Sequence, residues 1–194
     1  MKLSGRSVDE AKAAKGEQKF AMLCVACHGA DGKGNTAMGA PDLTNDIWLY
    51  GGSLRAIKES LIKGRNGYMP AFGSTLSAEQ LDQVASYVLS LSMDEGLDAQ
   101  KVAAGKEIFN GQAGGCHYCH TKEATGLESQ GAANLTDAIW TVANVPGAAD
   151  AEGRLDAVRY VIKNGIQRHM PAWADRLDDV QIKLLTVYVQ SLGG

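Results

Sequence analysis

The sequence has no cysteine outside two short motifs, no long apolar run and no excess of positive charge. Only four of its 194 residues are cysteines, and because all four lie in those motifs, none is left for a disulfide or a nucleophile. No apolar run approaches the roughly 18 residues that cross a bilayer. The formal net charge of -3 excludes the basic patch that nucleic acid binding requires. With 45% hydrophobic and 21% charged residues, the composition is that of a folded globular protein.

The N-terminal stretch also lacks a secretion signal. Met1 to Lys19 is polar and contains no apolar segment of the kind that such signals carry. If the cysteines require export, we expect the sequence to be a mature or shortened form.

Both cysteine pairs have the form CxxCH. They are Cys24-Val25-Ala26-Cys27-His28 and Cys116-His117-Tyr118-Cys119-His120. In this motif two thiols add to the vinyl groups of a haem as thioethers, and the histidine that follows binds the iron. The alternative is a structural zinc site built from the four cysteines, which would leave the repeated histidines and methionines without a purpose. The sequence therefore predicts two covalently attached c haems.

The chain repeats itself. The segment from Gly39 to Trp48 returns from Gly131 to Trp140, at the spacing that separates Cys24 from Cys116. A second shared segment carries methionine, as Met69-Pro70-Ala71-Phe72 and Met170-Pro171-Ala172-Trp173. We therefore predict two copies of one small domain, over residues 15–93 and 102–194, with an N-terminal tail over residues 1–14 and a linker over residues 94–101. The extra residues of the second copy, mostly 142–153, are predicted to form a surface loop rich in Gly, Ala and Pro.

Helical periodicity marks the end of each copy. Apolar residues recur at three- and four-residue spacing, at Leu81, Val84, Ala85, Val88 and Leu91, and at Leu177, Val180, Leu184, Tyr188 and Leu192. Ser77 and Gln80 predict a capped start of the first of these helices. Middle helices are predicted over residues 54–63 and 154–164, and strands are hard to find. The predicted fold class is all-α.

Aromatic residues on the leading and final helices are expected to pack together. Phe20 and Phe109 on the leading helices can meet Tyr87 and Tyr188 on the final helices, closing each domain around its haem. Gly16 and Gly105 would permit these helices to cross closely.

The sixth iron ligand is predicted to be a methionine. Of the six methionines, only Met69 and Met170 occupy equivalent positions, each followed by Pro-Ala-aromatic, whereas Met22 and Met93 are predicted to fill the core. His169, next to Met170, is the alternative ligand. Thioether ligation raises the haem potential and leaves no open coordination position, so we predict an electron-transfer protein rather than an enzyme.

Two tryptophans and two arginines are candidates for contacts with haem propionates. A buried indole N–H requires a hydrogen-bond acceptor, and a propionate would serve for Trp48 and Trp140. Arg65 and Arg168 closely precede the methionines and can also face propionates, although solvated arginines are the alternative.

Several motifs together resemble one known family. These are CxxCHGxDGKG, GAPxLT, the segment from Trp48 to Gly52, and the segment from Gly64 to Phe72. They are similar to the class I cytochrome c domains of the diheme subunit III, called CcoP or FixP, of cbb-three-type cytochrome c oxidases. The resemblance covers both copies and implies two tandem class I domains, each wrapped around one haem.

The resemblance also implies ligands and a location. It pairs His28 with Met69 and His120 with Met170, and it implies that a backbone carbonyl near Pro41 orients the first histidine, a role in which Ala133 can serve for the second. It further implies a periplasmic location and electron delivery toward the oxidase core, with a donor cytochrome and the oxidase catalytic subunit as partners.

Alternatives to the oxidase subunit stay open. The family's subunit is expected to carry an N-terminal membrane segment, which this sequence lacks, so the chain is either the soluble part of an anchored protein or a free periplasmic diheme shuttle. A diheme redox enzyme, such as a peroxidase, would need an open or unusually ligated iron, and spare Cys or His residues that could create one are nearly absent.

Overall fold

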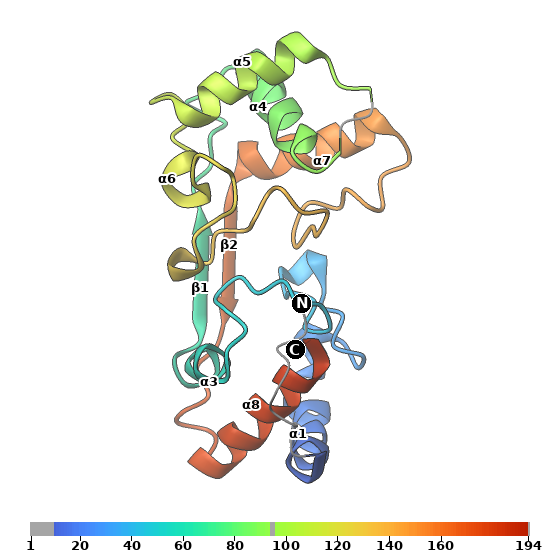
Figure 1. Cartoon of the computed structure of the whole chain (residues 1–194), viewed down its shortest axis with the longest axis vertical. Helices are drawn as coiled ribbons and strands as arrows, with labels where there is room; N and C mark the ends of the chain where they lie inside the picture. The colour runs from blue at the N-terminus through green and yellow to red at the C-terminus, as the bar shows by residue number, and fades with distance from the viewer. Residues whose placement is uncertain (1–9, 94–95, 194) are drawn as a thin grey trace. The chain divides into compact units, whose positions relative to one another are not determined.

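The computed structural model describes residues 10–93 and 96–193, which are mostly helical (Figure 1). In chain order the α-helices are α1 (Glu10–Leu23), α2 (Val25–His28), α3 (Leu54–Lys63), α4 (Ala78–Ser90), α5 (Ala99–Asn110), α6 (His117–His120), α7 (Ala151–Asn164) and α8 (Asp179–Gly193). Two strands, β1 (Arg65–Met69) and β2 (Ile166–Met170), and two 3-10 turns, Thr36–Met38 and Glu128–Gln130, complete the elements. No helix in these ranges has the length and apolar character that spanning a membrane requires.

The predicted helices are present, with some shifted starts. α3 spans the predicted residues, and Ser77 and Gln80 form a reciprocal capping box at the start of α4. α7 begins at Ala151 because the Asp150 side chain accepts the N–H of Gly153 and caps the helix there. Part of the predicted tail is helical, since α1 begins at Glu10; residues 1–9 lie outside the described part.

The loop over residues 142–153 is not wholly a surface loop. Its last three residues belong to α7. Ala143 and Val145 are buried, at 8% and 1% exposed, and join the core that contains Phe109. The two glycines and the proline of this segment predicted a turn, but they carried no information on which of its apolar residues pack inward.

The all-α prediction was wrong at β1 and β2. These strands pair with each other in a two-stranded sheet, and in both strands partly buried and exposed residues alternate. Figure 1 shows them running in opposite directions. Five residues with a glycine or a histidine among them carry little strand propensity of their own, so their extended form comes from pairing with a distant segment, which periodicity does not reveal.

The compact units differ from the sequence repeats. Unit 1 combines residues up to Asn66 with those from Arg168 onward, and unit 2 runs from Gly67 to Gln167. The chain therefore leaves unit 1 within β1 and returns to it within β2. As a result, α8 packs on α1 and α3, while α4 packs on α5 and α7 (Figure 1). Each final helix is exchanged: it completes the unit that contains the leading helix of the other repeat.

The helix crossings in both units depend on one glycine each. A Cβ on Gly16 in α1 would lie 2.2 Å from the carbonyl oxygen of Leu184 and 2.6 Å from Cβ of Tyr188 in α8. The equivalent Cβ on Gly105 in α5 would lie 2.0 Å from the carbonyl oxygen of Gln83 in α4. The predicted close crossing is confirmed, with the final helix of the other repeat as partner.

The aromatic pairs follow the same exchange. Phe20 packs against Tyr188 with ring centroids 5.3 Å apart, and Phe109 packs against Tyr87 at 5.2 Å. Both phenylalanines are fully buried, at 2% and 1% exposed. The expected contact between leading and final helices is therefore present, but it joins one repeat to the other.

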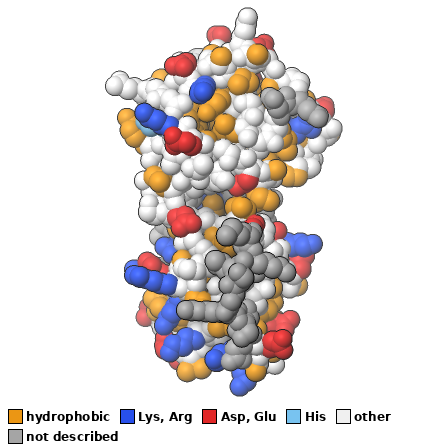
Figure 2. Space-filling model, viewed as in Figure 1, with side chains coloured by type: hydrophobic (Ala, Val, Ile, Leu, Met, Phe, Trp, Pro, Cys, Tyr) orange, Lys and Arg blue, Asp and Glu red, His pale blue; other side chains and the backbone are white. Residues whose placement is uncertain are grey.

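Charged side chains tie the helices of unit 2 together. The Asp82 carboxylate on α4 accepts Lys101 Nζ of α5 at 2.5 Å and an Arg159 guanidinium N–H of α7 at 2.5 Å. Burial pushes the pKa of Asp82 up, but the hydrogen bonds from Lys101 and Arg159 outweigh burial and leave the pKa below its ordinary value. On the face shown in Figure 2, acidic and basic side chains are intermixed, with hydrophobic groups between them.

We predict that Asp82→Asn destabilises the protein by about 1 kcal/mol at neutral pH, since the two cations lose their anionic partner. A lowered folded-state pKa gives stability that is present above the ordinary value of 3.8 and lost as the pH falls through the lowered pKa. The difference in the free energy of unfolding between the variant and the wild type should therefore become smaller at acid pH. Urea unfolding at neutral pH and well below pH 3.8 measures it, and Glu107→Gln, at an exposed carboxylate on α5, is the control. An equal difference at both pH values would contradict the prediction.

Candidate haem-binding sites

The two CxxCH motifs form the one-turn helices α2 and α6. Cys24 and Cys116 occupy the position before each turn, and His28 and His120 are its last residues. Burial raises the pKa of the Cys24 thiol to about 11 and that of Cys116 to about 11. The shift disfavours the thiolate form at these two positions.

The zinc alternative finds no support in the geometry. Within residues 10–93 and 96–193, no three His, Cys, Asp or Glu side chains gather closely enough to hold a metal ion. The first motif also belongs to unit 1 and the second to unit 2. All four cysteines are free of disulfides, which leaves each pair available for a separate group.

Each motif histidine is oriented by a backbone carbonyl. His28 Nδ1 lies 3.3 Å from the carbonyl oxygen of Pro41, and His120 Nδ1 lies 2.9 Å from that of Ala133. A protonated Nδ1 that donates to a carbonyl leaves Nε2 unprotonated for a metal. Burial lowers the pKa of both imidazoles, and the carbonyl hydrogen bond opposes it. Ala133, at the place of Pro41 in the second copy, therefore preserves the orienting contact, as the family resemblance implied.

The candidate methionine ligands lie at the ends of β1 and β2. Met69 packs against the core of unit 2, which contains Phe109 and borders Cys116. Met170 packs against the core of unit 1, which contains Phe20 and borders Cys24. The expected pairing of His28 with Met69 and of His120 with Met170 is therefore not what the structure brings together. Each methionine lies in the unit of the other repeat's motif.

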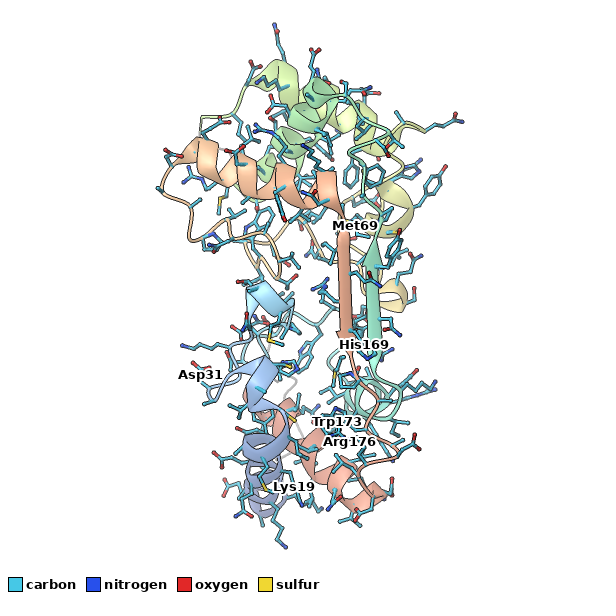
Figure 3. The ribbon with its side chains drawn as sticks, turned by 180° about the vertical axis from the view of Figure 1, so that it is seen from behind. Lys19, Asp31, Met69, His169, Trp173 and Arg176 are labelled. Atoms are coloured by element: carbon cyan, nitrogen blue, oxygen red, sulfur yellow. The ribbon has the colours of Figure 1, made fainter. Side chains whose placement is uncertain are left out.

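His169 does not approach either core. It is exposed, whereas Met170 beside it is partly buried, as the alternation along β2 requires. Its Nδ1 lies 2.6 Å from the Asn66 side-chain oxygen. Figure 3 labels His169 on β2, where the chain continues to Trp173 in the same unit. This geometry disfavours His169 as a ligand.

Of the four candidate residues for propionate contacts, one lies in unit 2 and three lie in unit 1. Trp140 packs against the core of unit 2, and its indole Nε1 is buried without a hydrogen-bond partner. A buried indole N–H without a partner fits a hydrogen-bond acceptor from a bound group, and Cys116 packs against the same core. Trp48 packs against the core of unit 1.

Both arginines belong to unit 1. Arg65 lies over the Tyr50 ring at 4.5 Å and donates to Ser60 Oγ at 2.8 Å. Burial lowers the pKa of Arg168, and Tyr50 opposes this. The arginine side chain passes so close to Gly39 that a Cβ there would lie 2.3 Å from its Cδ. The expected arrangement of one arginine per domain is replaced by two arginines in one unit.

Sequence reasoning missed two glycines that position the methionines. Gly64 ends α3 with φ +68°, and a Cβ on it would lie 2.4 Å from the carbonyl oxygen of Met170. Gly165 ends α7 with φ +71°, and its Cβ would lie 2.5 Å from that of Met69. The repeated Gly-x-x-x-x-Met spacing, from Gly64 to Met69 and from Gly165 to Met170, was the available signal.

Two CxxCH turns with carbonyl-oriented histidines, set in helical units, are features of the c-type cytochrome class. The family model for cytochrome c oxidase, cbb3-type, subunit III matches residues 11–88 and again residues 100–189. The chain belongs to this family. Membership indicates haem c as the cofactor, and the two matches confirm the predicted repeat and the predicted family.

Curated relatives are named as subunits of the same oxidase. The FixP subunit of Azorhizobium caulinodans is 40% identical over 189 residues, which cover 93% of this chain and 60% of the relative. The FixP subunit of Bradyrhizobium sp. (strain ORS 278) is 42% identical and is covered to 61%. The CcoP subunit of Azospirillum sp. is 36% identical and is covered to 69%. The chain thus spans about three fifths of the length of the first two relatives.

Proposed function

We propose that the chain carries two covalent c haems and passes single electrons toward the core of a cbb3-type oxidase. The observation that carries this proposal is the paired motif: in each unit a histidine is oriented through its Nδ1, and a motif cysteine and a methionine pack against the same core. Family membership supports it. Thioethers to Cys24 and Cys27, and to Cys116 and Cys119, hold the two groups.

The chain's own residues act by holding the iron rather than by converting a substrate. His28 and His120 would bind through Nε2, and Met69 and Met170 would each supply a thioether sulfur. The carbonyls of Pro41 and Ala133 keep the imidazoles in place. Held by a histidine and a methionine, such a group would supply one-electron exchange and would leave no site for a substrate. The subunit is therefore an electron carrier within an enzyme complex.

The propionates are proposed to meet different surroundings in the two units. In unit 2 the buried Trp140 Nε1 would donate to a propionate. In unit 1 the candidates are Trp48 and the two arginines, of which Arg168 has the lowered pKa that burial causes. Cationic groups beside a haem are one of the protein's levers on its potential.

The oxidase context rests on the relatives, which are named as subunits of cbb3-type cytochrome c oxidases. We propose the same for this chain, with a donor cytochrome and the oxidase catalytic subunit as partners and a periplasmic location. A free periplasmic diheme shuttle is the second candidate.

After expression with export and haem attachment, intact mass and haem staining are expected to report two haems per chain. One haem is expected after the double change Cys24→Ala with Cys27→Ala, and one after Cys116→Ala with Cys119→Ala. The ferric protein should be low-spin, with the near-infrared band of Met–Fe bonding, and should not turn over peroxide. Reduced protein is expected to restore electron delivery to an oxidase core that lacks subunit III.

Met22→Leu is the matched control. The prediction that Met22 fills the core was wrong, since its side chain is 74% exposed, and its replacement should leave the haem count and spectrum unchanged. A wild-type chain without covalent haem, or one with a large high-spin signal, would refute the haem proposal. Rapid oxidation by soluble acceptors without delivery to the oxidase core would favour the free shuttle.

A further inference from the structure

Two arginines of unit 1 gather around one tyrosine. The guanidinium carbon of Arg65 lies over the Tyr50 ring, 4.5 Å from its centroid. Arg65 also donates to Ser60 Oγ at 2.8 Å and to the carbonyl oxygen of Ala56 at 3.4 Å. Burial lowers the pKa of Arg168, and an electrostatic interaction with the same tyrosine opposes this. The two cations and the ring between them are all partly buried.

Arg168 also approaches the segment that orients the first motif histidine. A Cβ on Gly39 would lie 2.3 Å from Arg168 Cδ and 2.6 Å from its Cγ, so the arginine stem packs directly on the Gly39 backbone. Two residues later, the carbonyl oxygen of Pro41 lies 3.3 Å from His28 Nδ1. The arginine pair therefore belongs to the surroundings of the proposed haem site in unit 1.

Unit 2 has no arginine at the equivalent positions. The repeated Gly-x-x-x-x-Met spacing and the repeated tryptophan align the two copies there. The matching residues are uncharged, with Ile166 for Arg65, Gly67 for Arg168 and Val142 for Tyr50. All three belong to unit 2 and are partly buried. The site in unit 2 thus lacks both cations and the ring that holds one of them.

Acidic residues in the loops after the two motifs do not offset the arginines. Asp42 stands where the second copy has Asn134, and Asp137 stands where the first copy has Asn45, so each loop holds one of these carboxylates. Oδ2 of Asp137 is buried without a hydrogen-bond partner. Asp46, at a position that is not acidic in the second copy, is exposed, so salt and water screen its charge. The arginines remain as the main difference.

The overall charges of the units differ in the same direction. Residues 1–66 and 168–194 contain 13 Lys and Arg and 10 Asp and Glu, a net charge of +3 for unit 1. Residues 67–167 contain 6 Lys and Arg and 12 Asp and Glu, a net charge of -6 for unit 2. Most of the charged residues in the described ranges are exposed, and physiological salt screens such charges beyond about 8 Å. Partly buried cations are screened less.

We propose that Arg65 and Arg168 give the haem of unit 1 the higher reduction potential, so that a single electron taken up by the chain resides there. A ferric haem carries one more positive charge than a ferrous haem, so nearby cations favour the ferrous form. One electron leaves a ferrous haem in unit 2, which becomes ferric, and reduces the ferric haem in unit 1. The inference rests on the proposed function, because it concerns the haems that the chain is proposed to carry.

Redox titration of the two-haem protein, followed by absorbance, tests this order. Two potentials are expected, separated by roughly tenfold or more in the reduction equilibrium, which is about 59 mV for one electron. Arg65→Gln and Arg168→Gln should each lower the higher potential and leave the lower one unchanged. Arg168→Lys retains the charge and should restore the higher potential. Asp137→Asn removes a carboxylate from unit 2 and should raise only the lower potential.

Arg176→Gln is the matched control. Arg176 also belongs to unit 1 and lies over an aromatic ring, 4.3 Å from the centroid of Trp173 (Figure 3), but it is exposed. Its loss removes the same charge from the unit and should move neither potential. The near-infrared Met–Fe band, retained in every variant, shows that a change in potential does not come from a lost ligand.

Salt separates the arginine pair from the exposed charges. At 1 M ionic strength the Debye length falls to about 3 Å, which removes most of the effect of exposed groups. The separation of the two potentials is expected to persist in the wild type and to become smaller in both glutamine variants. Equal potentials, a separation that vanishes in salt, or arginine variants that shift the lower potential would overturn the inference.

The two proposals fail separately. Haem staining and intact mass report covalent attachment, and two haems per chain are expected whatever their potentials. A chain without covalent haem would refute the proposed function. Two covalent haems whose potentials are equal, or whose higher potential is insensitive to both arginines, would refute only this inference.

Discussion

Gly16→Ala and Gly105→Ala are each expected to destabilise the protein by about 1–3 kcal/mol, the usual cost of forcing extra atoms into a packed contact. In an open helix the same change would stabilise by roughly 0.5–1 kcal/mol, since alanine is the better helix former. The sign is reversed here because the new Cβ would lie 2.2 Å from the Leu184 carbonyl oxygen, or 2.0 Å from that of Gln83. Backbone atoms of a facing helix cannot move aside without separating the helices.

Gly153→Ala is the matched control for both variants. Gly153 is also helical, but the nearest atoms to its Cβ are Asp150 Oδ1 at 3.3 Å and Ala148 Cβ at 3.4 Å. It is expected to be neutral or slightly stabilising. Thermal or urea unfolding of the haem-loaded proteins, followed by circular dichroism, measures the three variants, and a stabilising Gly16→Ala would show that α1 and α8 do not cross at this point.

Phe20→Ala and Phe109→Ala are expected to have the largest effects of all, a loss of about 3–5 kcal/mol each. Both rings are almost fully buried and lie beside the motif histidines, with centroids 6.4 Å from the rings of His28 and His120. The cavity left by either would open a core that packs against a motif cysteine. Unfolding by denaturant measures the loss.

Double-mutant cycles then identify the partner of each ring. Leucine substitutions at Phe20 and Tyr188 should show a coupling of about 0.5–1.5 kcal/mol, as edge and tilted aromatic pairs do. Phe20 with Tyr87 should be additive, since Tyr87 packs against Phe109 instead. A coupling free energy between Phe20 and Tyr87 would contradict the exchange and would indicate that each repeat packs its own final helix on its own leading helix.

Patterns among residues close together in the sequence were sufficient to predict the helices and the chemistry of the CxxCH motifs. The Ser77 and Gln80 side chains make the capping box that their spacing predicts, and α3 spans the predicted residues. The carbonyls of Pro41 and Ala133 reach the motif histidines although one proline is replaced. These features depend on residues at most about a dozen positions apart, where chain connectivity leaves few alternatives.

The sequence could not predict which final helix packs on which leading helix, because the two repeats are alike. Both copies have a leading helix with the same Gly and Phe and a final helix with the same apolar stripe. By residue type alone, α4 could pack on α1 as well as α8 does. The strands β1 and β2 decide between the two arrangements, since their pairing carries each methionine segment out of its own repeat.

The sequence alone determined that this chain has two CxxCH motifs in a duplicated helical framework, with a methionine at an equivalent place in each copy, because these are properties of residue type and spacing. Tertiary structure alone decided which helix, which aromatic ring and which methionine completes each unit. The physical reason is that packing energy depends on the shape and burial of contacting surfaces, and two surfaces with the same residues are indistinguishable until the path of the chain between them is known.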